Sequence, residues 1–294
     1  MKTWRKGEEF DLVIPDKWKN VTIETILRKH WEAPKKLVHS MRMSGDIKVN
    51  GQMITWTEPL SPGDVMQIHL FKKTAYDVPP AYGEIDVLYE DDHLIVVNKP
   101  AGIDTHPNSP DDEDTLANYV AFHYQAKGES CRVMHIHRLD RDTSGAIIFA
   151  KHPLSKAILD RLLTERKIKR TYFALAHGHL KKKKGTISEP IGRDRHHNSR
   201  RRVSLNGQSA VTHYRVVEYR GTTTFVEVEL DTGRTHQIRV HMSHIGHPLV
   251  GDRLYGGKPL LKRQALHAAR IAFPHPLTEE PVECEAKCTD DIGL

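Results

Sequence analysis

Hydrophobic and polar residues along this chain first indicate a set of strands. Apolar runs at 85–90 and 94–98 are separated by a short polar segment, and they predict a hairpin. The short apolar run at 145–150 is bounded by turn residues and predicts a buried strand. Residues 211–217 and 224–230 alternate between apolar and polar positions, which is typical of paired strands in an antiparallel sheet.

Helical spacing occurs in other segments. Residues 153–167 carry leucine and isoleucine about one helical turn apart, which predicts an amphipathic helix, and residues 169–175 then predict a strand. A second helix is expected over about 115–125, with a residue of the acidic run 111–114 as its N-terminal cap. Thr235 is expected to cap a third helix, because threonine is a good N-cap residue and an apolar periodicity follows it.

The first quarter of the chain has its own pattern. Thr22 and Pro34 each precede a stretch with helical periodicity, and two short apolar stretches at 47–49 and 65–68 are flanked by strong turn signals. This composition predicts a small separate unit. The expected division is a small domain over 1–75, a linker over 76–83 and a large domain over 84–294.

Charge changes the picture, because it is unevenly distributed. The formal net charge is +6, but residues 121–220 contain 22 Lys or Arg and 8 Asp or Glu, a balance of +14. A concentrated basic block predicts a polyanionic partner, since phosphate contacts supply most of the affinity for nucleic acids. Residues 121–220 are therefore the expected surface for that polyanionic partner.

Other sequence features predict a cytoplasmic protein without a membrane segment. No apolar run approaches the roughly 20 residues that a membrane helix requires, and the first residues lack the apolar stretch of a signal peptide. The three cysteines, Cys131, Cys284 and Cys288, favour a reducing compartment over a disulfide framework. A metal site at Cys284 and Cys288 is not expected, because the sequence has no second cysteine pair.

Candidate chemistry is concentrated just before the predicted strand at 145–150. Residues 135–145 read H-I-H-R-L-D-R-D-T-S-G, so Asp140 lies between Arg138 and Arg141 on a loop that leads into the core. The neighbouring arginines are expected to keep the carboxylate ionised, as opposite charges do. An ionised aspartate in this position suits a nucleophile or a base.

Two strings of this sequence resemble the RluA-type pseudouridine synthases, which isomerise uridine to pseudouridine in ribosomal or transfer RNA. They are H-R-L-D-R-D-T-S-G, around Asp140, and L-D-T-G-R-T-H-Q-I-R-V-H, around Arg239. The resemblance implies an α+β fold, with a catalytic domain of mixed, largely antiparallel sheets behind a small S-four-like RNA-binding domain. It also implies that Asp140 is the catalytic residue, and that Arg138 displaces the target nucleotide.

The same resemblance implies further roles. Tyr172 is expected to pack against the target uracil, and Arg239 to pair with Asp140. Ribosomal RNA is the expected partner, ahead of transfer RNA, and a monomer without cofactor or metal is expected. The residues expected to contact RNA are Arg138, Arg141, Arg200, Arg201, Arg202 and Arg234.

Three alternatives explain parts of the sequence. The many histidines suggest a metal hydrolase, but no H-E-x-x-H motif is present and His236 does not share a helical face with His241 and His244. The D-T-G at 231–233 resembles half of an aspartic protease, a chemistry that needs a second such carboxylate. A non-catalytic RNA-binding protein has the same basic surface and differs only in whether Asp140 turns over substrate.

Overall fold

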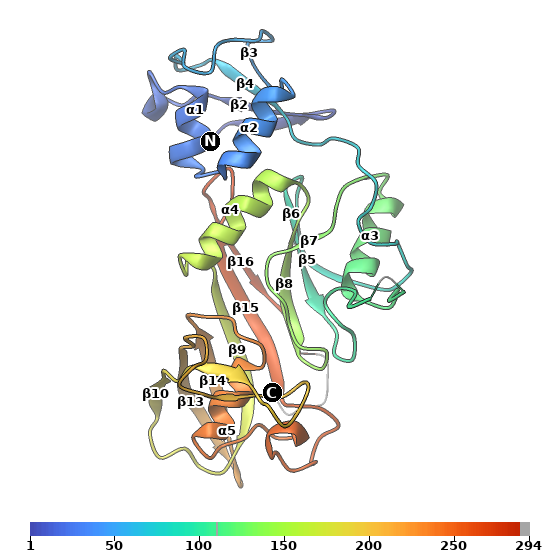
Figure 1. Cartoon of the computed structure of the whole chain (residues 1–294), viewed down its shortest axis with the longest axis vertical. Coiled ribbons are helices and arrows are strands. Elements are labelled where there is room, and N and C mark those ends of the chain that lie inside the picture. The colour runs from blue at the N-terminus through green and yellow to red at the C-terminus, as the bar shows by residue number, and fades with distance from the viewer. Residues whose placement is uncertain (110, 289–294) are drawn as a thin grey trace.

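The structure is a computed structural model that describes residues 1–109 and 111–288. The molecule is elongated: a small sheet with its helices forms one end, and a large sheet extends through the remainder (Figure 1). Pro110 and residues 289–294, which belong to the expected large domain, lie outside the described residues.

The end that contains the N-terminus has four antiparallel strands and short helices. In spatial order the strands are β1 (Thr3–Lys6), β2 (Glu9–Val13), β4 (Val65–His69) and β3 (Ile47–Val49). The helical segments are η1 (Asp16–Trp18), α1 (Ile23–Thr25), η2 (Ile26–His30) and α2 (Lys35–Met43). Thr22 caps α1 and Pro34 precedes α2, as predicted. The sequence did not predict β1, because most of its side chains are exposed and it has no apolar run.

A ten-stranded sheet organises the rest of the chain and is the mixed, largely antiparallel sheet that was expected. Its main path is β10 (Lys184–Ile187), β13 (Thr212–Arg220), β14 (Thr223–Leu230), β9 (Lys169–His177), β15 (Leu266–Pro274), β8 (Ser144–Ala150), β6 (Leu94–Lys99) and β5 (Asp86–Glu90). Two further strands are β16 (Pro281–Glu285), beside β15, and β7 (Met134–His135), beside β8. The pair β8 and β15 is parallel, and the other described pairings are antiparallel.

Helices cover both faces of this sheet near β8. Strand β8 is buried throughout, and its side chains alternate between two hydrophobic clusters, one with α4 (Pro153–Thr164) and one with α3 (Leu116–Ala126). The remaining elements are α5 (Gln237–His244), η3 (Arg253–Tyr255) and a separate hairpin of β11 (Ile191–Arg193) and β12 (Arg201–Val203). No described helix is long and apolar enough to cross a membrane.

Two expected helix caps are wrong. Thr115 occupies the N-cap position of α3, and Asp112 of the acidic run instead accepts hydrogen bonds from the backbone N–H groups of Asn108 and Ser109 at 2.8 and 3.0 Å. Thr235 does not cap α5, because His236 occupies that position with a left-handed backbone, φ 58°. The backbone folds into a tight turn there, and the helix begins only after it.

The two ends of the molecule share a hydrophobic core. One cluster of buried residues runs from the N-terminal sheet into β6, β8 and α4. At the junction Phe10 and Phe71 pack against His93, with ring centroids 4.9 and 5.6 Å apart. His152 lies against the same ring and bonds to it at 2.9 Å, and His275 lies 5.5 Å from it between ring centroids. The junction is therefore a buried aromatic contact, and the sequence did not indicate such a contact.

Candidate active site

The loop between β7 and β8 presents Asp140, and hydrogen bonds fix it on both sides. The hydroxyl of Thr105 donates to the backbone oxygen of Leu139 at 3.1 Å and accepts from its N–H at 3.2 Å. The backbone N–H of Thr143 donates to the carbonyl of Asp140 at 3.0 Å, which closes the turn. Because the turn is fixed on both sides, the Asp140 side chain leaves the loop in a defined direction.

The side chain of Lys99 also holds this loop in place. It is fully buried, and its ammonium donates to three backbone carbonyls, those of Pro100, Ile103 and Arg141, at 2.7 to 2.8 Å. Burial lowers the pKa of Lys99 to about 8, so the charged form that makes these bonds still predominates at neutral pH. The contact to Arg141 fixes the chain one residue after Asp140.

Arg239, on α5, joins two carboxylates. It donates to Asp140 Oδ2 through Nη1 at 2.9 Å, and to both oxygens of Asp252 through Nε and Nη2 at 2.7 and 2.9 Å. Burial alone would lower the pKa of the guanidinium, but the two carboxylates outweigh burial and raise it. The Asp252 side chain is almost fully buried at 1% exposure, whereas that of Asp140 is 22% exposed. Arg239 is thus held by the buried Asp252, and it contacts the more exposed Asp140 with its remaining nitrogen.

His236 completes the surroundings of Asp140. Its Nε2 lies 3.9 Å from Asp140 Oδ2, and its Nδ1 lies 2.8 Å from the hydroxyl of Tyr255. Burial lowers the pKa of His236, so the ring is neutral at pH 7. The cation that compensates Asp140 is therefore Arg239.

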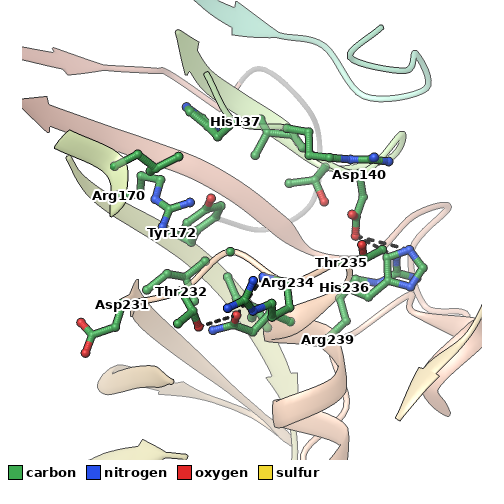
Figure 2. A pocket seen from close by; sticks show the side chains of 18 of the residues that line it. His137, Asp140, Arg170, Tyr172, Asp231, Thr232, Arg234, Thr235, His236 and Arg239 are labelled. Atoms are coloured by element: carbon green, nitrogen blue, oxygen red, sulfur yellow. Dashed lines mark hydrogen bonds and ion pairs between the residues drawn. The ribbon is translucent and has the colours of Figure 1, made fainter. Parts of the chain in front are cut away.

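Asp140 lies on the rim of a cavity of about 470 Å³ (Figure 2). Tyr172, on β9, lines the cavity with its ring and is only 5% exposed, and burial raises the pKa of its hydroxyl. Apolar walls come from Ile238 and Leu266. A flat aromatic ring beside a fixed carboxylate, between apolar walls, offers room for a planar base.

The arginines beside Asp140 in sequence do not pair with it. Arg141 is exposed and lies 3.7 Å from Asp104, and exposed Arg138 lines both the main cavity and a neighbouring one of about 280 Å³. The described ion pairs of Asp140 include neither arginine, because adjacent side chains leave a loop in different directions. The structure assigns that contact to Arg239.

Arg234 and the arginines of the β11–β12 hairpin are the other residues that were predicted to contact RNA. Arg234 lines the cavity and donates to the backbone oxygen of Ser209 at 3.0 Å. Arg200 lies over the ring of Tyr255, 5.7 Å from its centroid, and the backbone N–H of Arg201 donates to the hydroxyl of Tyr255 at 2.9 Å. Arg202 is exposed. Because Tyr255 also contacts His236, the β11–β12 hairpin is connected to the active site.

Comparison with known proteins decides the family. Residues 93–244 match the family model described as RNA pseudouridylate synthase, and residues 10–66 match that of the N-terminal domain of the ribosomal pseudouridine synthase RluD. The chain belongs to the RNA pseudouridine synthase family. It is therefore an enzyme that isomerises uridine in RNA, and the α+β fold behind a small N-terminal domain is the one the sequence predicted.

The names of individual relatives agree with this family assignment. This synthase is 48% identical over 291 residues to the RNA pseudouridine synthase YhcT of Bacillus subtilis, covering 98% of this chain and 96% of the relative. It is 38% identical to the ribosomal large subunit pseudouridine synthase D of Xylella fastidiosa, and the match covers 85% of this chain and 80% of the relative. Human RNA pseudouridylate synthase domain containing 1 has 31% identity and a TM-score of 0.56, covering 74% of this chain and 87% of that one. The name of the second relative confirms the predicted RluA type.

The structure adds residues that the sequence did not single out for this synthase. Asp252 and Lys99 are two of them, and their contacts depend on segments that are distant in the chain. Arg170 and His137 line the cavity and are almost completely buried, a property that no sequence pattern reveals. No cluster of three or more potential metal-ligating side chains occurs among the described residues.

Proposed function

We propose that this enzyme isomerises uridine in large-subunit ribosomal RNA, with Asp140 as the catalytic carboxylate. The observation that carries the proposal is the pair of Asp140 and Arg239 at 2.9 Å, on the rim of a cavity lined by Tyr172. The choice of RNA rests on relatives named ribosomal large subunit pseudouridine synthase D.

The proposed mechanism follows from what the reaction requires. The C–N glycosidic bond breaks, the uracil turns while bound, and its carbon 5 joins the ribose. Carbon 5 then loses its proton, and the ring nitrogen that left the ribose gains one, so atoms and charge balance. Asp140 acts at the sugar–base junction as nucleophile or base, and Arg239 holds its charge in place. Tyr172 supplies a flat surface for the turning base.

Positive charge around the cavity mouth suits an RNA backbone. Arg138 lies beside Asp140 and is proposed to fill the place of the extruded nucleotide. Phosphate contacts are proposed for the remaining predicted arginines, namely Arg141, Arg200, Arg201, Arg202 and Arg234. A uridine in a stem must leave the stack before it can reach the cavity, and the backbone contacts would hold the RNA in that state.

The test is a pseudouridine map of ribosomal and transfer RNA from cells that lack the gene. Complementation with the parent chain should restore the missing pseudouridines in large-subunit ribosomal RNA, and complementation with Asp140→Asn should not. Loss confined to transfer RNA would overturn the ribosomal assignment. Restoration by Asp140→Asn, with the variant expressed at the parent's level, would overturn the catalytic assignment and leave Asp140 as a structural ion pair.

A further inference from the structure

A buried arginine in the main cavity has no partner among the described residues. Arg170, on β9, is 8% exposed and lines the cavity, yet no hydrogen bond or ion pair joins its guanidinium to a described residue. Its Nε is completely buried without an acceptor. A buried cation without a counter-ion is strongly unfavourable, so the guanidinium is set up for a ligand that accepts hydrogen bonds.

His137 is a second unpaired group in the same cavity. It is 7% exposed, and both ring nitrogens are buried without a hydrogen-bond partner. Burial, with a smaller contribution from the charge of Arg170, lowers the pKa of His137 to about 3. The ring is therefore neutral, with one nitrogen that donates and one that accepts. Together the two side chains offer a strong donor and a neutral acceptor.

Their position relative to Tyr172 indicates what they contact. In Figure 2, Arg170 and His137 lie toward one end of the cavity and Asp140 toward the other, with the ring of Tyr172 between Arg170 and Asp140. A base stacked on Tyr172 with its glycosidic bond at Asp140 would point its far edge at Arg170. This placement rests on the role proposed above for Asp140.

We propose that Arg170 and His137 form the subsite that recognises the carbonyl and imide edge of the uracil. Arg170 donates to a carbonyl oxygen, and the unprotonated nitrogen of His137 accepts from the imide N–H. Cytosine is disfavoured, because its ring nitrogen at position 3 carries no hydrogen to donate to His137, and because an amino group replaces one of the two carbonyls that Arg170 meets during the turn. Leaving these buried groups unpaired costs about tenfold or more in affinity.

The same subsite can hold the base through its rotation. The edge of uracil reads carbonyl, N–H, carbonyl, and it is symmetric about the line from the imide nitrogen to the opposite ring carbon. A half turn about that line exchanges the two carbonyls and exchanges the glycosidic nitrogen with carbon 5. Arg170 and His137 therefore meet the same pattern before and after the turn, and the detached base stays bound in both orientations.

Binding of mononucleotides tests the subsite without any turnover. Uridine 5′-monophosphate, its 3-methyl derivative and cytidine 5′-monophosphate are titrated into the full-length parent, and the ring ¹⁵N signals of His137 and the guanidinium signals of Arg170 are followed. The uridine nucleotide should shift both sets of signals and bind about tenfold or more tightly than the other two. Equal binding of all three, or no binding of the uridine nucleotide, would overturn the proposal.

Two variants and a matched control sharpen the result. Arg170→Met and His137→Phe keep the volume of the side chain and should each abolish the preference for uridine. Arg170→Met should not lower the melting temperature, because it removes an unpaired buried charge, whereas a structural arginine would lower it. Arg270→Met removes a cation from the neighbouring strand β15 that pairs with Glu227, outside the cavity, and should keep the preference. A variant at Arg170 or His137 that retains the parent's preference contradicts the assignment.

This readout is separate from the proposed function. If ribosomal RNA from the deletion strain keeps all its pseudouridines while the parent protein still prefers uridine over cytidine nucleotide, the function fails and the subsite stands. The reverse combination removes the subsite and leaves the function.

Discussion

Arg239 links a carboxylate that faces the cavity to one that is buried. The Asp252 side chain, 1% exposed, binds two nitrogens of the guanidinium, whereas Asp140 binds the third from a more open position. Two-point contacts fix the plane of an arginine, and a single contact does not. The direction in which Arg239 holds Asp140 is therefore set by Asp252, which itself lies behind the arginine and away from the cavity.

Replacing Asp252 by asparagine should separate this positioning from RNA binding. Asp252→Asn keeps the shape of the side chain but loses the charge and one acceptor for Arg239. The rate constant for pseudouridine formation should fall by about tenfold to a hundredfold, while the KM for RNA stays near the parent value. Single-turnover kinetics with a melting curve measure both. A fall in melting temperature with unchanged kinetics would mean that Asp252 only stabilises the fold.

At the scale of residues, part of the site was predicted from the sequence. The pair of Asp140 and Arg239 was expected from the resemblance and is present at 2.9 Å. The expected contacts of Arg138 and Arg141 with Asp140 are absent from the described interactions, because neighbours in a loop do not share a direction. Arg170 is buried without a hydrogen-bond partner, and this could not be predicted, because it depends on segments that are far apart in the sequence.

At the scale of elements, β8 shows what hydrophobic patterning can and cannot reveal. Its apolar run correctly predicted a buried strand. The parallel approach of β15, with Ala268 beside Gly145, was not foreseeable, because parallel partners are distant in the chain. Gly145 has φ +117°, and an added Cβ would lie 2.3 Å from the backbone oxygen of Ala268. Glycine is therefore required where the Asp140 loop enters the strand.

Gly145→Ala should damage both stability and activity. The methyl group must displace the backbone of β15, and the strained backbone adds to this, for a loss of about 2 to 5 kcal/mol in the free energy of unfolding. Gly221→Ala is the matched control, since Gly221 also has positive φ, +57°, but nothing lies within 4 Å of its added Cβ. Urea unfolding of both variants measures the difference. Equal losses would show that backbone strain, and not the close contact with Ala268, determines the effect.

The β11–β12 hairpin is the element that most directly tests the RNA surface. Arg200 and Arg202 are exposed, and the neighbouring Arg201 contacts Tyr255 through its backbone. Replacing Arg200 and Arg202 by glutamine should reduce the slope of log affinity against log salt by up to about two, because each phosphate contact contributes close to one.

The control for this measurement removes two cations elsewhere. Arg215 and Arg270 both pair with Glu227, and their double replacement by glutamine changes the net charge by the same amount. Its salt slope should stay close to the parent value in the same binding titration. If the slope of log affinity against log salt falls by the same amount in both double variants, the change in net charge explains the effect, and the hairpin makes no specific contact with RNA.

At the scale of the whole molecule, the junction between the two ends has a shared core that the sequence did not indicate. The division into 1–75, 76–83 and 84–294 remains a prediction, but the shared core shows that the two ends bury apolar surface against each other. The sequence did not mark His93, His152 and His275 as residues of this junction, because histidine has no characteristic spacing in helices or strands. Their burial links the stability of this contact to pH.

The last prediction concerns that dependence. Burial lowers the pKa of His93 from 6.5 to about 4, and that of His152 falls well below 6.5 for the same reason. Between about pH 6.5 and 4 the unfolded chain therefore binds more protons than the folded one, so stability present above pH 6.5 is lost as the pH falls through this window. For His93 the loss is about 3 kcal/mol at most. Melting temperatures from pH 7.5 to 4.5 should fall steeply in the parent.

His93→Phe should make this fall shallower, because phenylalanine can pack against Phe10 and Phe71 but cannot take up a proton. The decline should not vanish, since His152, whose pKa burial also lowers, becomes protonated on unfolding in the same pH window. His39→Gln, at an exposed position of α2, is the control and should follow the parent curve. A parent whose melting temperature is flat from pH 7.5 to 4.5, or a His93→Phe curve as steep as the parent's, would show that the junction does not sense acid.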